Sequence, residues 1–261
     1  MRGNRIMTIT ALTYLICCPL LFLAGLVDSI GGGGGLISLP AYLLAGLPVH
    51  TAIATNKLSS ACGTTVSTVR FIKEGLINWG IAVPSIIAAI IGSSVGARLS
   101  LVIPEKVLVY ILVVVLPVTA FVVLNRKIFK DNGSTEVVHD KKTYVTAVLA
   151  ALIIGFYDGV YGPGTGTFLI IAFTVFAKLG VKTANGQTKA INLTTNITSL
   201  VIFILHGQVL FAVGLPCALC NMAGNYIGSG LVMKNGIKVV RPSIIAVLGL
   251  LAVKIVTEHI I

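Results

Sequence analysis

The stretch GLVDSIGGGGGLISLP, residues 25–40, interrupts an apolar region with five consecutive glycines, Gly31 to Gly35, and places Asp28 three residues before them. A glycine weakens a helix interior by about 0.8–1.0 kcal/mol relative to alanine, and a carboxylate within hydrocarbon is costly as well. Non-helical backbone persists at membrane depth only where it is buried in protein or lines a watery cavity. The stretch therefore predicts a broken or re-entrant helix beside an internal polar site.

The composition places this break in a membrane protein. Of the 261 residues, 56% are hydrophobic and 10% are charged, whereas a soluble domain carries about 25% charged residues. The net charge of +11 comes from basic residues at the ends of apolar segments, where membrane topology places them. No basic patch interleaved with aromatic residues points to nucleic acid. We therefore expect an all-α polytopic membrane protein in a lipid bilayer, with no nucleic-acid partner.

Ten apolar runs divide into two sets of five. The first set lies near 6–27, 36–48, 51–72, 79–103 and 107–124, and the second near 143–161, 166–179, 190–205, 208–233 and 239–257. A membrane-spanning helix needs about 20 residues, so the runs at 36–48 and 166–179 are too short, and about eight transmembrane helices are expected. This pattern predicts one membrane domain, made of an N-terminal repeat (1–124), a basic cytoplasmic connector (125–142) and a C-terminal repeat (143–261).

Matching residues support the two repeats. Lys57 matches Lys189 at a spacing of 132 residues, and Asp28 matches Asp158 at a spacing of 130. The motif Gly92-x-x-x-Gly96 likewise matches Gly224-x-x-x-Gly228, and such spacing is typical of close helix packing in membranes. An odd number of crossings in each half places most Lys and Arg residues on the inside, whereas four crossings split them almost evenly. The positive-inside rule thus favours inverted halves.

The two glycine loops are candidates for contact with an anion. The sequences DSIGGGGG, from residue 28, and DGVYGPGTG, from residue 158, break two short segments at corresponding places. Such paired breaks indicate the binding site of a transporter, because free backbone N–H groups at a helix start bind anions. The candidate residues are Gly33, Gly34, Gly35, Gly164, Thr165 and Gly166. The alternative is that these glycines only permit close packing.

Two lysines begin polar stripes on otherwise apolar helices. Lys57, Ser60, Thr64 and Ser67 share one helical face, as do Lys189, Asn192, Asn196 and Ser199. With no surplus of carboxylates, an anionic substrate is a candidate counter-charge, bound by Lys57, Lys189, Asn56 and Asn192. The alternative is that each lysine extends to the membrane surface.

Asp28 and Asp158 lie one turn before the loops. Carboxylates within a membrane mark ion or proton paths, so both are candidates for proton coupling. The alternative is that they only hold the loops in shape.

Five cysteines lie in apolar segments, and Cys217-x-x-Cys220 permits a redox or zinc hypothesis. A structural zinc site needs four ligands, and no further Cys or His lies close in sequence. We therefore expect no metal, no cofactor and no catalytic residues.

Three stretches together resemble the TauE/SafE sulfite exporter family of the TSUP permease superfamily. They are GLVDSIGGGGGLISLPAYLLAGLPVHTAIATNKLSSACGTTVSTVRF (25–71), GFYDGVYGPGTGTFLIIAF (155–173) and GQTKAINLTTNITSLVIF (186–203). The resemblance implies a permease of the bacterial inner membrane with duplicated halves, for small sulfur-containing anions such as sulfite or sulfoacetate. The second loop has Pro163 and Thr165 in place of glycine, so the two halves need not contact substrate equally.

The leading hypothesis is therefore a secondary transporter of a small anion, not an enzyme, with protons as the candidate coupling ion. No Walker motif points to ATP as the direct energy source. An anion channel and a transporter of a small organic carboxylate remain alternatives, as do a thiol-based membrane enzyme and a membrane assembly factor. The sequence leaves the oligomeric state open.

Overall fold

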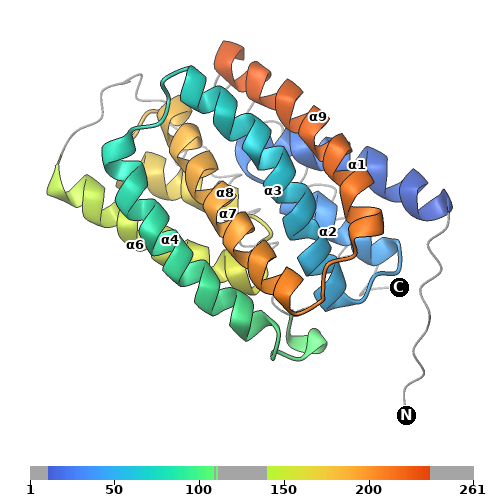
Figure 1. Ribbon diagram of the computed structural model, residues 1–261. Helices are drawn as coiled ribbons and strands as arrows, with labels where there is room; N and C mark the ends of the chain where they lie inside the picture. Colours follow the sequence, from blue (N-terminus) through green and yellow to red (C-terminus); the bar gives the residue numbers. More distant parts are fainter. Residues whose placement is uncertain (1–10, 109, 111–139, 236–261) are drawn as a thin grey trace.

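The computed structural model describes residues 11–108, 110 and 140–235, and all regular structure within these ranges is helical (Figure 1). The helices are α1 (Ala11–Gly31), α2 (Gly35–Leu44), α3 (Val49–Lys73), α4 (Trp79–Ser100), α6 (Lys141–Val160), α7 (Thr165–Ile171), the π-helical turn η1 (Ala172–Phe176), α8 (Val181–Leu205) and α9 (Phe211–Asn235). Most of the apolar runs expected at 107–124 and 239–257, and of the connector at 125–142, lie outside the described residues.

Four helices of this part of the chain, α1, α4, α6 and α8, are long and apolar enough to cross a membrane. Helices α3 and α9 have 25 residues each, a length of about 37 Å, but are not among these four. The expectation of an all-helical, multi-pass membrane protein is confirmed for the described ranges. Three features stay predictions: the presence of about eight membrane spans, the internal repeat, and the inverted orientation of its two copies.

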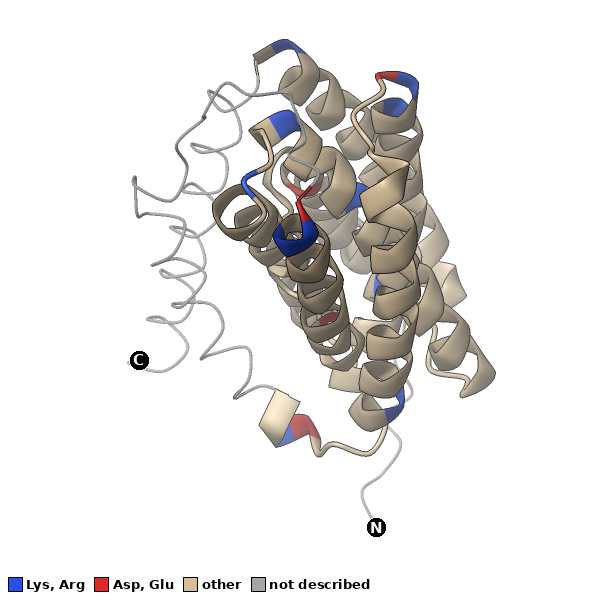
Figure 2. Cartoon of the chain, turned by 90° about the vertical axis from the view of Figure 1, so that its left-hand side faces the viewer, with Lys and Arg blue, Asp and Glu red and all other residues tan. Residues whose placement is uncertain are grey.

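The outer faces of the helices carry large apolar side chains. Charged residues of the described ranges lie mostly near helix ends (Figure 2). Leu15 of α1, Ile87 of α4 and Ile153 of α6 are each more than half exposed. A row of exposed, large apolar side chains on a long helix is suited to contact with lipid. The polar residues of α3 and α8, by contrast, are mostly buried inside the bundle.

Both glycine loops break a helix, as predicted. Helix α1 ends at Gly31 and α2 begins at Gly35, with Gly32 between them at φ 72°. Helix α6 ends at Val160 and α7 begins at Thr165, with Gly162 at φ 102° and Gly164 at φ 84°. Glycine adopts these left-handed conformations readily, whereas other residues do so at a cost. The glycines therefore allow each chain segment to leave one helix and start a short second one.

The most extensive contacts join the first and last of the described helices, α1 and α9, and two helices from the middle of the chain, α4 and α6. Helix α1 lies along α9, α4 lies along α6, and α3 packs against both α8 and α9 (Figure 1). At these crossings the paired glycines face main-chain atoms of the neighbouring helix: Gly224 and Gly228 face α1, and Gly92 and Gly96 face α6. The expected packing role of the two G-x-x-x-G motifs is confirmed.

Replacing Gly96 by leucine is expected to separate α4 from α6. A Cβ atom at Gly96 would overlap the main-chain oxygen of Phe156, and overpacking of this kind costs about 1–3 kcal/mol or more. The matched control is Val95→Leu, because Val95 is the preceding residue and is 52% exposed. Thermal unfolding in detergent should show a lower midpoint for Gly96→Leu only. Equal midpoints for the two variants would contradict this packing.

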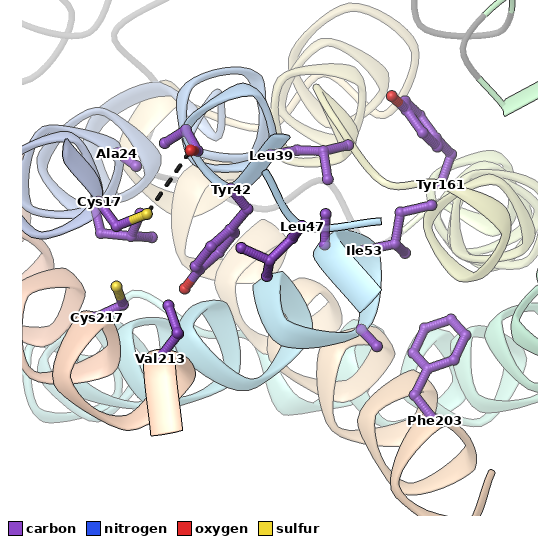
Figure 3. Packing of buried hydrophobic residues seen from close by; sticks show 14 of the residues in the cluster. Cys17, Ala24, Leu39, Tyr42, Leu47, Ile53, Tyr161, Phe203, Val213 and Cys217 are labelled. Atoms are coloured by element: carbon purple, nitrogen blue, oxygen red, sulfur yellow. Dashed lines mark hydrogen bonds between the residues drawn. The ribbon is translucent and has the colours of Figure 1, made fainter. Parts of the chain in front are cut away.

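A buried apolar cluster surrounds Tyr42 of the short helix α2 (Figure 3). It joins Leu39 and Tyr42 of α2 to Ile53 of α3 and to Phe203 of α8. The Tyr42 hydroxyl donates to Oγ of Ser59 at 3.0 Å, which satisfies a buried polar group that would otherwise be costly. The short helix is thus fixed against α3, the helix that carries Lys57.

Candidate functional site

The two glycine loops, defined as residues 31–35 and 161–166, touch each other inside the bundle. A Cβ atom on Gly32 would overlap the main chain of Gly166, and one on Gly35 would lie 3.1 Å from Cα of Pro163. Thr167 at the start of α7 donates to the main-chain oxygen of Gly31 at 2.8 Å. Side chains at Gly32 or Gly166 would hold the loops apart, so the absence of side chains brings the two helix breaks to one place.

Lys57 of α3 forms a buried ion pair with Asp158, in the last turn of α6. Its Nζ lies 2.8 Å from Oδ2 of Asp158, and the two side chains are only 2% and 3% exposed. The other carboxylate oxygen, Oδ1, accepts a hydrogen bond of 2.8 Å from Oγ1 of Thr165. Asp158 is therefore held between a lysine of α3 and the first residue of α7.

Lys189 of α8 forms a second buried ion pair with Asp28, in the last turn of α1. Its Nζ lies 2.9 Å from Oδ2 of Asp28, and the two side chains are 0% and 12% exposed. The same Nζ also donates to the main-chain oxygen of Asp28, near the C-terminal end of α1, where a cation is favoured by the helix dipole.

These pairs give both lysines a counter-charge within the protein, a role for which the sequence had offered an anionic substrate as a candidate. Each lysine of one half binds the aspartate of the other half: Lys57 binds Asp158, and Lys189 binds Asp28. The alternative in which the lysines extend to the membrane surface is wrong, because both residues are at most 1% exposed. The four charges of these two pairs thus compensate one another within the protein.

A polar cavity of about 20 Å³ lies between the ion pairs and the glycine loops. This volume holds about one water molecule. The lining comprises Asp28, Gly32, Gly35, Asn56, Lys57, Ser60, Asp158, Gly162, Thr165, Gly166, Asn192 and Asn196. An anion with several non-hydrogen atoms needs more room than this cavity offers.

Eight of the residues singled out from the sequence meet at this cavity: Asp28, Gly35, Asn56, Lys57, Asp158, Thr165, Gly166 and Asn192. The other four, Gly33, Gly34, Gly164 and Lys189, are not in its lining. Gly34 instead packs against the side chain of Asp28. Ser60 of α3 and Asn196 of α8 also line the cavity. Their helical spacing from Lys57 and Lys189 in the sequence indicated that they share a face with these lysines. Gly32 and Gly162 were not named, although both lie within the quoted loops.

The cysteines also meet across the fold. Cys17 and Cys18 of α1 belong to the same apolar cluster as Cys217 and Cys220 of α9, and Figure 3 shows Cys17 facing Cys217. The two pairs of cysteines lie far apart in the sequence, so their proximity was not predicted. All five cysteines are free thiols. No group of His, Cys, Asp or Glu that could hold a metal ion occurs in the described ranges.

A family model described as "Sulfite exporter TauE/SafE" matches residues 17–255. This match covers most of the chain. The protein belongs to the TauE/SafE family. All four charged residues of the two ion pairs, and both glycine loops, lie within the matched TauE/SafE region.

Several curated relatives of this TauE/SafE protein are named as probable membrane transporter proteins. A "Probable membrane transporter protein ORF9" from Sinorhizobium sp is 34% identical over 91% of this chain and 90% of its own length. The "Probable membrane transporter protein YfcA" of Escherichia coli K12 is 31% identical over 98% and 94%. A "Probable membrane transporter protein" of Haemophilus influenzae is 28% identical over 96% of both chains. No solved structure gives a significant match.

Proposed function

We propose that this TauE/SafE protein is a secondary transporter of a small anion in the bacterial cytoplasmic membrane. One observation carries the proposal: two buried ion pairs join the halves of the sequence around a polar cavity, at the point where two helices break. Buried ionisable residues in a membrane protein mark substrate or ion paths. Broken helices that meet inside the bundle are the usual binding site of a secondary transporter.

The substrate class follows from the family and from the chemistry of the cavity. Lys57 offers a positive charge, and Asn56, Ser60 and Asn192 offer amide or hydroxyl donors. These groups suit an oxyanion, and family membership favours a sulfur oxyanion or an organosulfonate, such as sulfite or sulfoacetate. A small organic carboxylate has the same charge and the same acceptors, and is the alternative substrate.

The arrangement of the helices supports two inverted repeats that move against each other. Under the matching derived from the sequence, α1 corresponds to α6 and α4 corresponds to α9. The contact of α1 with α9 then corresponds to the contact of α6 with α4, as a two-fold relation requires. Movement between such halves gives alternating access. A cavity of about one water molecule favours this gated mechanism over an open anion channel.

The test is anion flux into proteoliposomes, with sulfite, sulfoacetate, methanesulfonate and acetate as substrates. We expect saturable uptake of at least one of the sulfur anions by the wild-type protein. Lys57→Met should lower this uptake at least tenfold, because it removes the positive charge that lines the cavity. The matched control is Lys73→Met, since Lys73 lies on the same helix but is exposed, and its uptake should be unchanged.

Three results would count against the proposal. The absence of flux for every anion, with folded protein in the vesicles, would reject anion transport. Flux that rises linearly with concentration would favour a channel. Equal uptake by the Lys57→Met variant and the wild type would remove Lys57 from the site.

A further inference from the structure

We propose that the two ion pairs have different roles in transport: the anion opens the Lys57–Asp158 pair and takes the place of Asp158 on Lys57, as Asp158 binds one proton, while the Lys189–Asp28 pair stays closed. This inference rests on the proposed transport of a small anion, and it names the coupling ion and the residue that carries it.

The contacts of the two lysines differ. Within the described part of the chain, Lys57 has one ion-pair contact, with Oδ2 of Asp158. Lys189 contacts two acceptors, Oδ2 and the main-chain oxygen of Asp28. Release of Lys189 breaks two contacts, one to the carboxylate and one to the main-chain oxygen of Asp28, whereas release of Lys57 breaks a single contact. The Lys57 pair is therefore the easier one to open.

The position of the cavity points to the same pair. Lys57 lines the cavity together with Asp158, but Lys189 does not. Next to Lys57, Oγ of Ser60 donates to Oδ1 of Asn56 at 3.4 Å, and both side chains also line the cavity. An anion in this space would reach the ammonium group of Lys57 and these neutral groups, while Lys189 would remain behind Asp28.

Charge balance then requires a proton. The two pairs together carry no net charge when all four groups are ionised. A monoanion bound on its own would leave one negative charge uncompensated in the interior, which is strongly unfavourable. One proton from water, bound at Oδ2 of Asp158 as Lys57 leaves it, restores neutrality. Oδ1 can keep its hydrogen bond from Thr165, so the rest of the loop need not change.

The charged surroundings of Asp158 leave it as the group that accepts this proton. Lys57 comes from α3, Asp28 from α1 and Lys189 from α8, and the last two are already paired with each other. The charged residue of α4, Arg98, is exposed. Tyr157 and Tyr161 flank Asp158 on its own segment, and Oη of Tyr157 donates to the main-chain oxygen of Pro163.

The test compares Asp158→Asn with the double variant Asp28→Leu and Lys189→Met, which removes the second ion pair as a neutral whole and leaves the first in place. The probe is methanesulfonate, which keeps one negative charge at neutral pH, or sulfite if methanesulfonate is not carried. Internal pH and anion content are measured together in proteoliposomes. For the wild type we expect one proton per methanesulfonate and no effect of an imposed membrane potential. With sulfite the proton count is corrected for the anion's own ionisation.

The two variants should then separate. In Asp158→Asn, anion-for-anion exchange should continue while proton movement falls at least tenfold, because Lys57 stays available to the anion but no carboxyl group takes up the proton. Net uptake should also fall, since the empty site would carry an unpaired lysine. In the double variant Asp28→Leu with Lys189→Met, the ratio of protons to anions should stay at the wild-type value, even if the rate falls, because the net charge of the site is unchanged. Loss of the ratio in the double variant, or its retention in Asp158→Asn, would overturn the proposal.

A second measurement avoids dependence on the folding of the variants. Binding of methanesulfonate (or of sulfite) to purified wild-type protein in a weakly buffered solution should take up one proton per bound anion. Binding without proton uptake would overturn the inference and leave anion transport intact. Failure of the wild type to carry any anion would instead reject the proposed function itself.

Discussion

Lys189→Met is expected to lower the free energy of unfolding by about 3–5 kcal/mol, the usual cost when one partner of a buried ion pair is removed. Asp28 would be left without its counter-charge, at a position where its side chain is 12% exposed. The tie between α8 and the main-chain oxygen of Asp28, near the end of α1, would be lost as well. Chemical unfolding in detergent micelles, followed by circular dichroism, measures the change.

Two further variants separate loss of charge balance from loss of packing. The double variant Lys189→Met with Asp28→Leu should recover most of the lost stability, because a neutral apolar pair of similar volume often replaces a buried ion pair without cost. Lys182→Met, on the same helix, removes a lysine that donates to the main-chain oxygen of Met233 at 2.9 Å, and should cost about 1 kcal/mol. Equal losses in the single and double variants would contradict the role of charge balance.

Gly32→Ala is expected to abolish transport and to reduce the yield of folded protein. Alanine at φ 72° is strained by about 1–2 kcal/mol, and its Cβ atom would overlap the main chain of Gly166 in the other loop. Since neither backbone can move without disturbing a helix end, the two helix breaks would separate. Size-exclusion chromatography and anion flux in proteoliposomes measure the two effects.

The neighbouring Gly33 provides the matched control. A Cβ atom there would meet side-chain atoms of Val27, Leu36 and Thr167 at 3.6–3.8 Å, which is ordinary contact. Gly33→Ala should therefore keep wild-type yield and elution volume. If Gly32→Ala behaved like Gly33→Ala, close contact between the two loops would not be needed for the fold.

Local patterns predicted much of this structure. Glycine runs indicated both helix breaks, and helical spacing placed Ser60 and Asn196 on the faces of the two lysines. The spacing of Gly92 and Gly96 indicated a close crossing, which the contact of α4 with α6 confirms. In each case the physical cause acts within one or two helical turns, so it is visible in a short stretch of sequence.

The partners across the fold could not be predicted in this way. Asp28 and Lys189 are 161 residues apart, and nothing near either residue specifies the other. A counter-charge for the lysines was therefore sought in a substrate, although the protein supplies one. The meeting of Cys17 with the segment of Cys217 was missed for the same reason. Such pairs depend on how the helices pack in three dimensions. The local sequence preferences of each helix do not determine this packing.

The crossing of the ion pairs has a consequence for biosynthesis. Helices α1 and α3 are made before α6 and α8, so Asp28 and Lys57 enter the membrane before Asp158 and Lys189 exist. Until then each carries a charge whose final partner is absent, and an uncompensated charge in hydrocarbon is unfavourable. The two charges of the N-terminal segment are therefore paired as in the final structure only after the C-terminal segment has inserted. A stable product thus requires the complete chain.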